Sequence, residues 1–221
     1  MKHGQAEALC ERFWSKLPAN IGAAAWGIVA PRFTHLIELL LKSAHARKLL
    51  SSSQRNTESL WEHLFDSLQA LQLIEPESEM HILDAGSGNG FPGLPLALAL
   101  PNVRISLAER SGSKAEFLEF AAASLSITSA TVLAMEVGSR TWDALKPDLV
   151  IMRALLRASQ LPRLFLPNDP SAPPFVVFTT AEKSSEWIFT AKSLGYGLLK
   201  SHAYVYPGTG ANRETLKFIK R

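Results

Sequence analysis

The stretch Ile82-Leu83-Asp84-Ala85-Gly86-Ser87-Gly88-Asn89-Gly90-Phe91 is the most informative part of this 221-residue chain. It places a Gly-x-Gly-x-Gly turn directly after a short apolar run and before a helical pattern that starts at Leu94. Glycine lets the backbone turn sharply and lets a ligand approach without a clash from Cβ. In an open α/β sheet, ligands bind beyond the carboxyl ends of the strands. The stretch therefore predicts a buried strand followed by a ligand-binding loop.

Two classes of cofactor compete for this loop. A dinucleotide fingerprint needs its third glycine at position 91, where the chain has the bulky Phe91, and the third glycine falls at Gly90 instead. Asp84 precedes the loop by two positions, and its carboxylate would repel a pyrophosphate. Glu109 follows Gly88 by 21 residues at the end of the next predicted strand, where a carboxylate can bind both ribose hydroxyls. These features favour S-adenosylmethionine, which carries an ammonium and a sulfonium but no phosphate.

From residue 75 onward, short apolar runs alternate with helical patterns, which is typical of βαβ units and a parallel sheet. We expect strands at His81–Ala85, Val103–Ala108, Ala130–Ala134, Asp148–Met152, Phe175–Thr179, Gly197–Val205 and Glu214–Ile219. The expected helices are Leu94–Leu100, Lys114–Leu125, Leu155–Leu166 and Glu182–Leu194. The short turn Pro207-Gly208-Thr209-Gly210 suits a hairpin, so the last strand should run antiparallel to its neighbours.

The first third of the chain has a different pattern, without strands. Helical spacing is found in Ala6–Leu17, in Phe33–Leu50 and in a stretch that Asn56 or Thr57 could cap. The acidic segment Glu75-Pro76-Glu77-Ser78-Glu79 is the best boundary in the sequence. We therefore expect an N-terminal helical extension over residues 1–74 and an α/β core over residues 75–221.

Composition narrows the possible classes of protein. Apolar residues make up 47% of the chain and charged residues 19%, which allows a sizeable core and excludes global disorder. The one cysteine, Cys10, excludes an internal disulfide framework and a cysteine-rich zinc site. No apolar stretch is long enough for a membrane span. We therefore expect a cytoplasmic, monomeric protein with no bound metal.

The loop and its continuation, Asp84-Ala85-Gly86-Ser87-Gly88-Asn89-Gly90-Phe91-Pro92-Gly93-Leu94-Pro95, resemble the first motif of the bacterial small-subunit rRNA guanine-N7 methyltransferases. This is the RsmG or GidB family, named after glucose-inhibited division protein B. Further similarities follow in order along residues 48–221. They are His63-Leu64-Phe65-Asp66-Ser67-Leu68, Lys114 with Phe117 and Leu118, Met135-Glu136, Arg153-Ala154 and Arg213-Glu214.

The resemblance implies a class I, Rossmann-like S-adenosylmethionine-dependent methyltransferase fold. Such a fold has a doubly wound, seven-stranded sheet with an antiparallel last strand, here preceded by N-terminal helices. The implied reaction is methyl transfer to N7 of a guanine in 16S rRNA, with that rRNA or the small ribosomal subunit as partner. The residues expected to bind the cofactor are Asp84, Gly86, Ser87, Gly88, Gly90, Phe91, Glu109, Met135, Glu136 and Arg153.

Two departures from the family pattern bear on the RNA rather than on the cofactor. The family's Asn-Leu-Thr before the His-x-x-Asp-Ser helix is not recognisable, and Leu50-Ser51-Ser52 stands near that place. The family usually has a lysine after the fifth strand, where this chain has Thr179-Thr180, with Lys183 three residues on.

Arg153 is the candidate catalytic residue. It follows a buried strand at the carboxyl edge of the sheet, where a guanidinium can hold a phosphate or read O6 of guanine. The alternative is an arginine paired with a nearby Asp or Glu. The N-terminal region has 8 basic and 6 acidic residues, and Arg47, Lys48 and Arg55 within it are the expected phosphate contacts.

Two other classes of function stay open on the sequence alone. One is a non-catalytic RNA-binding or assembly module on a methyltransferase fold, which the complete glycine motif argues against. The other is a methyltransferase that acts on a small molecule or a protein. The net charge of +3 permits a nucleic-acid partner without requiring one.

Overall fold

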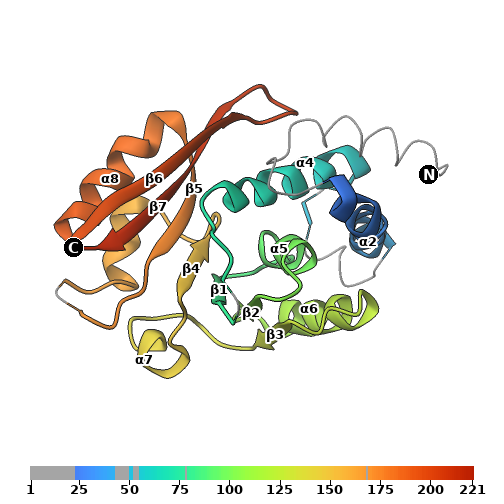
Figure 1. Ribbon diagram of the computed structural model, residues 1–221, viewed down its shortest axis with the longest axis horizontal. Coiled ribbons are helices and arrows are strands. Elements are labelled where there is room, and N and C mark those ends of the chain that lie inside the picture. Colours follow the sequence, from blue (N-terminus) through green and yellow to red (C-terminus); the bar gives the residue numbers. More distant parts are fainter. Residues whose placement is uncertain (1–22, 43–49, 52–54, 78, 168) are drawn as a thin grey trace.

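A computed structural model describes residues 23–42, 50–51, 55–77, 79–167 and 169–221 of the chain (Figure 1). Its centre is a seven-stranded sheet in the order β3-β2-β1-β4-β5-β7-β6. The strands are β1 His81–Ala85, β2 Arg104–Ala108, β3 Ala130–Leu133, β4 Leu149–Met152, β5 Phe175–Thr180, β6 Tyr196–Val205 and β7 Asn212–Lys220. Strand β7 runs in the opposite direction to the other six, which confirms the expected sheet and its antiparallel last strand.

Helices cover both faces of the sheet (Figure 1). On one face lie α2 Ala23–Lys42, α4 Thr57–Leu68, α5 Gly93–Ala99 and α6 Gly112–Ser124. On the other lie α7 Thr141–Leu145 and α8 Ser184–Ser193. Short 3₁₀ turns complete the described elements: η2 Gln69–Gln72, η3 Ala158–Arg163 and η4 Ala181–Lys183. This arrangement is the doubly wound, Rossmann-like architecture.

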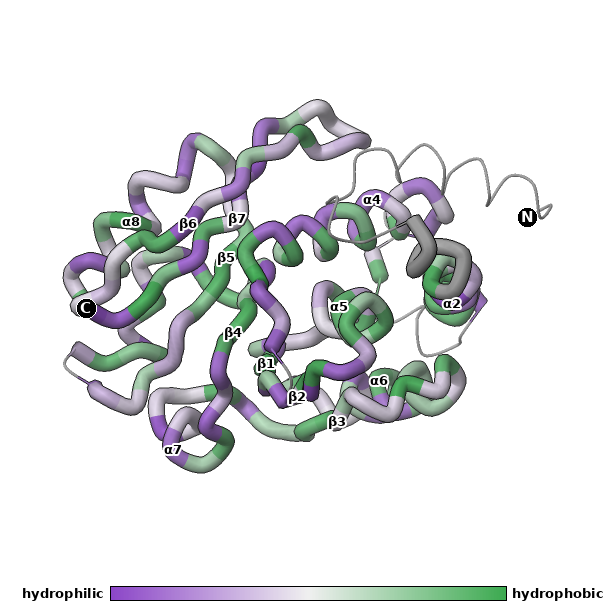
Figure 2. The backbone as a smooth tube through the Cα atoms, in the orientation of Figure 1, coloured by the Kyte–Doolittle hydropathy of each residue, from purple (hydrophilic) through white to green (hydrophobic). Residues whose placement is uncertain are grey.

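Each face of the sheet has its own hydrophobic core. In β4, Leu149 and Ile151 pack with α4 and α5, whereas Val150 and Met152 pack with η3 and α8. A strand that is buried on both faces needs a continuous apolar sequence rather than an alternating one. Figure 2 shows this pattern as hydrophobic segments along β4 and β5 in the middle of the molecule.

The N-terminal helices join the core of the sheet. Asn56 caps α4 as expected, because its Oδ1 accepts a hydrogen bond of 2.8 Å from the backbone N–H of Ser59. Arg32 of α2 donates to the carbonyl of Leu125, at the end of α6, over 2.6 Å. Because α2 and α4 share one core with the sheet, the boundary at residue 75 stays a prediction about domains rather than an observed division.

One prediction of local structure was wrong, and two helical segments were not predicted. The helix expected over Leu155–Leu166 is only the η3 turn, because Pro162 within it lacks an N–H donor and its ring clashes with the preceding turn. Helix α2 begins at Ala23, where alanines favour a helix without an apolar period, and it contains Pro31. Helix α7 was not expected.

Part of the remaining predictions falls outside the described residues, namely the helix Ala6–Leu17 and positions 43–49 of Phe33–Leu50. Within the described residues, no helix has the length and the apolar composition needed to cross a membrane.

Candidate active site

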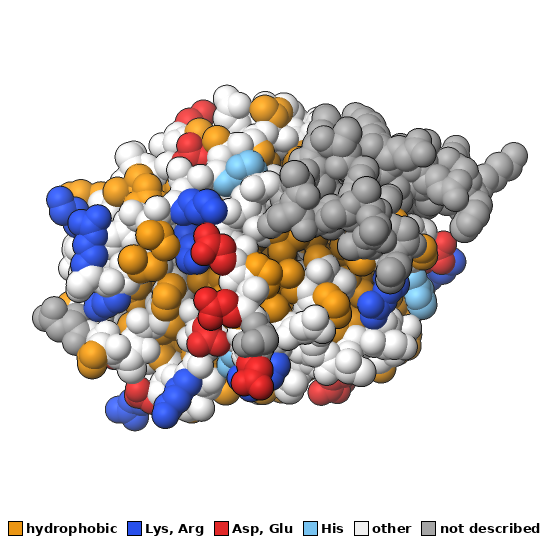
Figure 3. Space-filling model, viewed as in Figure 1, with side chains coloured by type: hydrophobic (Ala, Val, Ile, Leu, Met, Phe, Trp, Pro, Cys, Tyr) orange, Lys and Arg blue, Asp and Glu red, His pale blue; other side chains and the backbone are white. Residues whose placement is uncertain are grey.

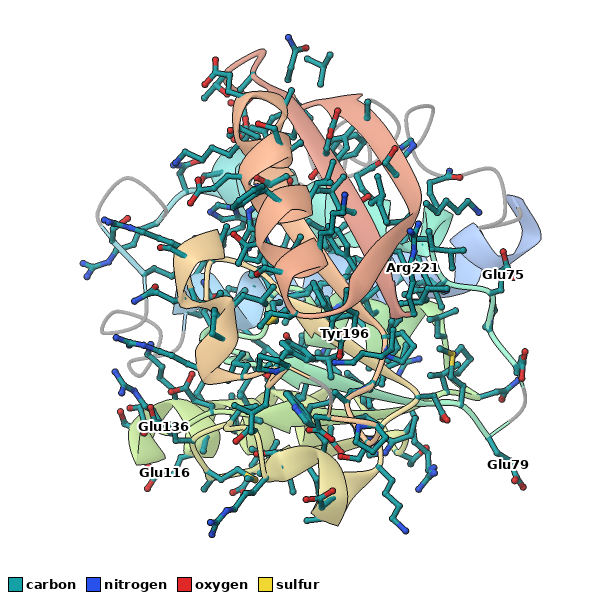
Figure 4. All side chains as sticks on the ribbon, turned by 90° about the vertical axis from the view of Figure 1, so that its left-hand side faces the viewer. Glu75, Glu79, Glu116, Glu136, Tyr196 and Arg221 are labelled. Atoms are coloured by element: carbon teal, nitrogen blue, oxygen red, sulfur yellow. The ribbon has the colours of Figure 1, made fainter. Side chains whose placement is uncertain are left out.

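A cavity of about 700 Å³ lies at the carboxyl ends of the parallel strands. Figure 4 shows this polarity, because Glu75 and Glu79 precede β1 and lie on one side, whereas Glu136 follows β3 and lies on the other. The cavity opens beside β1, where the strand order reverses between β2 and β4, and this switch point is the usual ligand site of such a sheet. Eight predicted cofactor residues line it: Gly86, Ser87, Gly88, Phe91, Glu109, Met135, Glu136 and Arg153.

Backbone hydrogen bonds connect the glycine loop to the end of β2, and the loop is open toward the cavity. The backbone N–H groups of Gly86 and Ser87 both donate to the carbonyl of Ala108 over 2.9 Å. Gly88 has a φ of +58°, in the left-handed region that favours glycine. A Cβ at Gly88 would find no atom of the chain closer than 3.8 Å. The loop therefore leaves space for a ligand to approach the backbone.

Two residues that the sequence assigned to the cofactor, Asp84 and Gly90, do not line the cavity. Asp84 lies behind the loop, and a Cβ at Gly90 would meet the side chains of Leu94 and Leu118. Asp84 is 1% exposed, and its Oδ2 accepts a hydrogen bond of 3.0 Å from the backbone N–H of Gly93. Its Oδ1 is buried without a partner. Burial raises the pKa of Asp84 to about 7, against the opposing effects of the nearby Ser87 hydroxyl and the N–H of Gly93. A carboxylate at this position supports the loop from below instead of facing the ligand.

Glu109 is held at the edge of the cavity by two backbone groups. Its Oε2 accepts from the N–H of Gly88 over 2.9 Å, and its Oε1 accepts from the N–H of Ser111 over 2.8 Å. The side chain is therefore fixed, and each oxygen retains a further lone pair that can accept a hydroxyl. Glu136 differs, because it is 74% exposed and lies 3.5 Å from Arg110 in a surface ion pair.

Arg153 lines the cavity and also forms an ion pair with Asp66. The sequence had left such a pairing open as the alternative to an RNA contact. Its Nε donates to Oδ2 of Asp66 over 2.6 Å, and Asp66 is fully buried in α4. The other oxygen of Asp66 accepts from the hydroxyl of Tyr204 over 2.6 Å and lies 3.1 Å from Nε of Arg213. One carboxylate therefore orients two guanidinium groups at the active site.

His63 belongs to the same network. Its Nδ1 lies 2.7 Å from Nη2 of Arg153 and 3.1 Å from the hydroxyl of Tyr206. Burial first, and then the charge of Arg153, lower the pKa of His63 to about 4. Since an arginine can only donate, Nδ1 accepts and the proton of the neutral ring is on Nε2. The sequence pointed to His63 and Asp66 through their shared motif, but Tyr204 and Tyr206 carried no signal.

A second cavity of about 240 Å³ adjoins the first, and the two share Ala154, Leu155 and Leu156. Arg213 lines this second cavity, together with residues from the ends of β4 and β5. Sequence patterns did not predict this second cavity, because its walls come from segments that are distant along the chain. In the described part of the chain, no cluster of three or more His, Cys, Asp or Glu side chains is suited to a metal.

Of the three predicted RNA contacts, the structure describes Arg55 alone. Arg47 and Lys48 lie outside the described residues. Arg55 donates from Nε to the carbonyl of Leu50 over 3.0 Å and lines neither cavity. Other cations line the two cavities, as a group that we call the cationic rim: Arg110, Lys114, Arg157, Arg163 and Lys183.

Comparison with known sequences supports this picture. Residues 30–193 match the family described as rRNA small subunit methyltransferase G, or GidB. The chain is 29% identical over 215 residues to the Ribosomal RNA small subunit methyltransferase G of Myxococcus xanthus, covering 95% of this chain and 98% of that protein. The protein of the same name from Gloeobacter violaceus is 34% identical over 170 residues, with 74% of this chain and 68% of that protein covered.

Solved structures share the fold at low sequence identity. TYW2 of M. jannaschii in complex with AdoMet is 14% identical with a TM-score of 0.51, over 72% of this chain and 77% of that chain. A mutant of MtNAS in complex with S-adenosylmethionine is also 14% identical, with a TM-score of 0.55 over 86% of this chain and 73% of that chain. These two likenesses show a common fold and nothing more specific.

Proposed function

The chain belongs to the rRNA small subunit methyltransferase G (GidB) family, and on that premise we propose that it transfers a methyl group from S-adenosylmethionine to N7 of a guanine in 16S rRNA. The observation that carries the proposal is the open glycine loop at the switch point, held by Glu109 beside a cavity of about 700 Å³. With ribosomal RNA as substrate, we propose that the protein acts in the cytoplasm, and its monomeric state remains a prediction.

The residues around the first cavity fit S-adenosylmethionine. Gly88 leaves room for close approach of the cofactor to the backbone, and Glu109 offers oxygens that can accept the ribose hydroxyls. Met135 lines the same cavity and adds an apolar surface. The loop does not match the dinucleotide fingerprint that binds a pyrophosphate, since Phe91 occupies the position of its third glycine.

The proposed chemistry needs alignment more than proton transfer. Guanine N7 has an in-plane lone pair and no proton to lose, so a general base is unnecessary. S-adenosylmethionine would supply a methyl group that is already activated on a sulfonium. Alignment of two reacting groups can contribute roughly 7–11 kcal/mol in favourable cases. The neutral His63, which accepts a hydrogen bond from Arg153, supports a positioning role for this pair rather than acid–base catalysis.

The distribution of charge supports an RNA substrate on the carboxyl-end face. The cationic rim surrounds the cavities there, with Arg110, Arg157, Arg163 and Lys183 exposed. The opposite face, on which Glu75 and Glu79 lie, is the one that Figure 3 presents, and acidic side chains gather in its middle. A polyanion is attracted to a group of exposed cations such as the cationic rim.

The test is transfer of tritium from labelled S-adenosylmethionine to unmodified small ribosomal subunits and to naked 16S rRNA. We expect labelled 7-methylguanosine after digestion to nucleosides. Cofactor binding measured by calorimetry serves as the control. A protein that fails to bind the cofactor would be a non-catalytic module, whereas binding without labelled rRNA would indicate a different methyl acceptor.

A further inference from the structure

We propose that the second cavity is the pocket for the guanine base, with Glu186 and Arg213 as the residues that read its polar edges. This inference rests on the proposed function, because it takes a guanine as the methyl acceptor. Both residues line the cavity of about 240 Å³ that adjoins the first one. Neither belongs to the glycine loop or to the set that the sequence assigned to the cofactor.

The position of the cavity suits a methyl acceptor. Residues Ala154, Leu155 and Leu156 form a wall that both cavities share, so a base in the second cavity would lie next to the cofactor. Ala154 has a φ of +56°, a strained conformation for alanine that redirects the chain at the end of β4. Leu155 packs over Gly86, since a Cβ there would lie 2.4 Å from its Cδ1. The shared wall is therefore built against the glycine loop.

The polar groups in the cavity match the edges of guanine. Guanine presents acceptors at O6 and N7 and a donor at its 2-amino group, and its N1–H is a further donor. A guanidinium can donate to O6 while N7 remains available for the methyl group, and a carboxylate can accept from N1–H and the 2-amino group. Arg213 and Glu186 provide these two groups. Adenine would place its 6-amino donor against the arginine instead.

Arg213 is oriented before any ligand arrives. Its Nε lies 3.1 Å from Oδ1 of Asp66, and its guanidinium carbon lies 5.3 Å from the ring centroid of Tyr206. Thr180 lines the same cavity, and its hydroxyl is buried without a hydrogen-bond partner. At this place the chain departs from the family's usual lysine. A cation held by the fold and an exposed carboxylate therefore line one small cavity.

The experiment uses a synthetic small-subunit rRNA fragment that carries the guanine methylated by the wild-type protein, and the same fragment with inosine at that position. Inosine keeps N7, O6 and N1–H but lacks the 2-amino group. We expect the wild-type kcat/KM to fall about tenfold on the inosine fragment, the size of a single polar contact to a base. Glu186→Ala, which removes both acceptor oxygens, should lose a similar factor on the guanine fragment and should no longer distinguish the two fragments.

Two controls separate this inference from its alternatives. Glu182→Ala removes an exposed carboxylate from the neighbouring η4 turn, outside both cavities, and should keep the wild-type kcat/KM and the discrimination. The affinity of Glu186→Ala for S-adenosylmethionine should also be unchanged. Equal rates on both fragments with the wild-type protein, or full discrimination in Glu186→Ala, would overturn the pocket. Absence of any methyl transfer by the wild-type protein would instead overturn the proposed function.

Discussion

Gly88 combines a left-handed backbone with open space on its cavity side, so its substitution can separate ligand binding from folding. Gly88→Ala should lower the free energy of unfolding by about 1 kcal/mol, the strain of a left-handed alanine. It should also weaken S-adenosylmethionine binding about tenfold, because the new methyl group occupies the approach of the ligand. Gly210→Ala is the matched control, since Gly210 has a φ of +68° with no atom within 4 Å of its Cβ position.

Calorimetry and denaturant titration on both variants decide this prediction. The two substitutions should cost similar stability, and only the one in the glycine loop should change the dissociation constant. Wild-type affinity in Gly88→Ala would mean that the cofactor does not approach this loop.

Asp84 should make the stability of the protein depend on pH. Burial raises its pKa from 3.8 to about 7, so the folded state retains a proton that the unfolded state loses. The free energy of unfolding should therefore fall as pH rises from about 4 to about 7, by up to roughly 1.4 kcal/mol per pH unit from this group. Asp84→Asn cannot titrate and should show a flatter profile.

The difference between the two pH profiles isolates Asp84, because the opposite contribution of His63 is present in both proteins. Urea denaturation at several pH values gives the profiles. Asp143→Asn, which removes an exposed carboxylate from α7, should leave the wild-type slope intact. Parallel profiles for wild type and Asp84→Asn would contradict a raised pKa.

Among the secondary-structure elements, α4 is joined to the sheet by polar contacts as well as by its apolar face. Asp66 contacts Arg153 at the end of β4, Tyr204 of β6 and Arg213 of β7. The turn between β6 and β7 lies against the same helix, because a Cβ at Gly208 would clash with the carboxylate of Glu62. A helix that precedes the sheet thus orients two arginines at the active site.

Asp66→Asn should lower the free energy of unfolding by about 3–5 kcal/mol, because it leaves two largely buried guanidinium groups without their counter-charge. Chemical denaturation measures this loss. Glu77→Gln, an exposed carboxylate in the linker, should change stability by less than about 0.5 kcal/mol. A loss below about 1 kcal/mol in Asp66→Asn would show that the arginines find other partners.

At the scale of the whole molecule, charge is divided between the two ends of the sheet. The cationic rim lies at the carboxyl ends, where both cavities open, and the acidic linker lies at the amino ends. On the proposed function, we expect this distribution to orient the protein on an RNA with the active site toward the phosphates.

Each rim cation that contacts a phosphate should contribute about 0.7–0.9 to the slope of log affinity against log salt concentration. Arg157→Gln, Arg163→Gln and Lys183→Gln should each reduce the slope for 16S rRNA by that amount. Lys200→Gln, beside Glu75 on the opposite face, should leave it unchanged. Arg55→Gln tests the sequence-based assignment directly. A reduced slope in that variant alone would indicate that the RNA contacts the N-terminal region instead of the cationic rim.

Local sequence patterns predicted the alternation of strands and helices, the glycine loop after β1, the cap at Asn56 and the hairpin before β7. These features follow from local rules: apolar runs, glycines and caps act on residues that are close along the chain. The residues Gly88 and Glu109 could be assigned to one site because parallel strands bring their carboxyl ends to the same edge. Local rules identify the end of a strand but not the side of the loop on which the side chain of Asp84 lies, so its contact with the N–H of Gly93 could not be predicted.

The partners of Arg153, His63 and Arg213 depend on contacts between segments that are distant along the chain. Arg153 meets Asp66 across 87 positions, and Tyr206 meets His63 across 143. No local pattern encodes such pairs, because they depend on the strand order that places β7 beside β5 and its hairpin against α4. The second cavity arises in the same way, from the ends of β4 and β5 and the start of α8. Its polar side chains come together through packing in three dimensions, so the linear sequence does not show that they line one cavity.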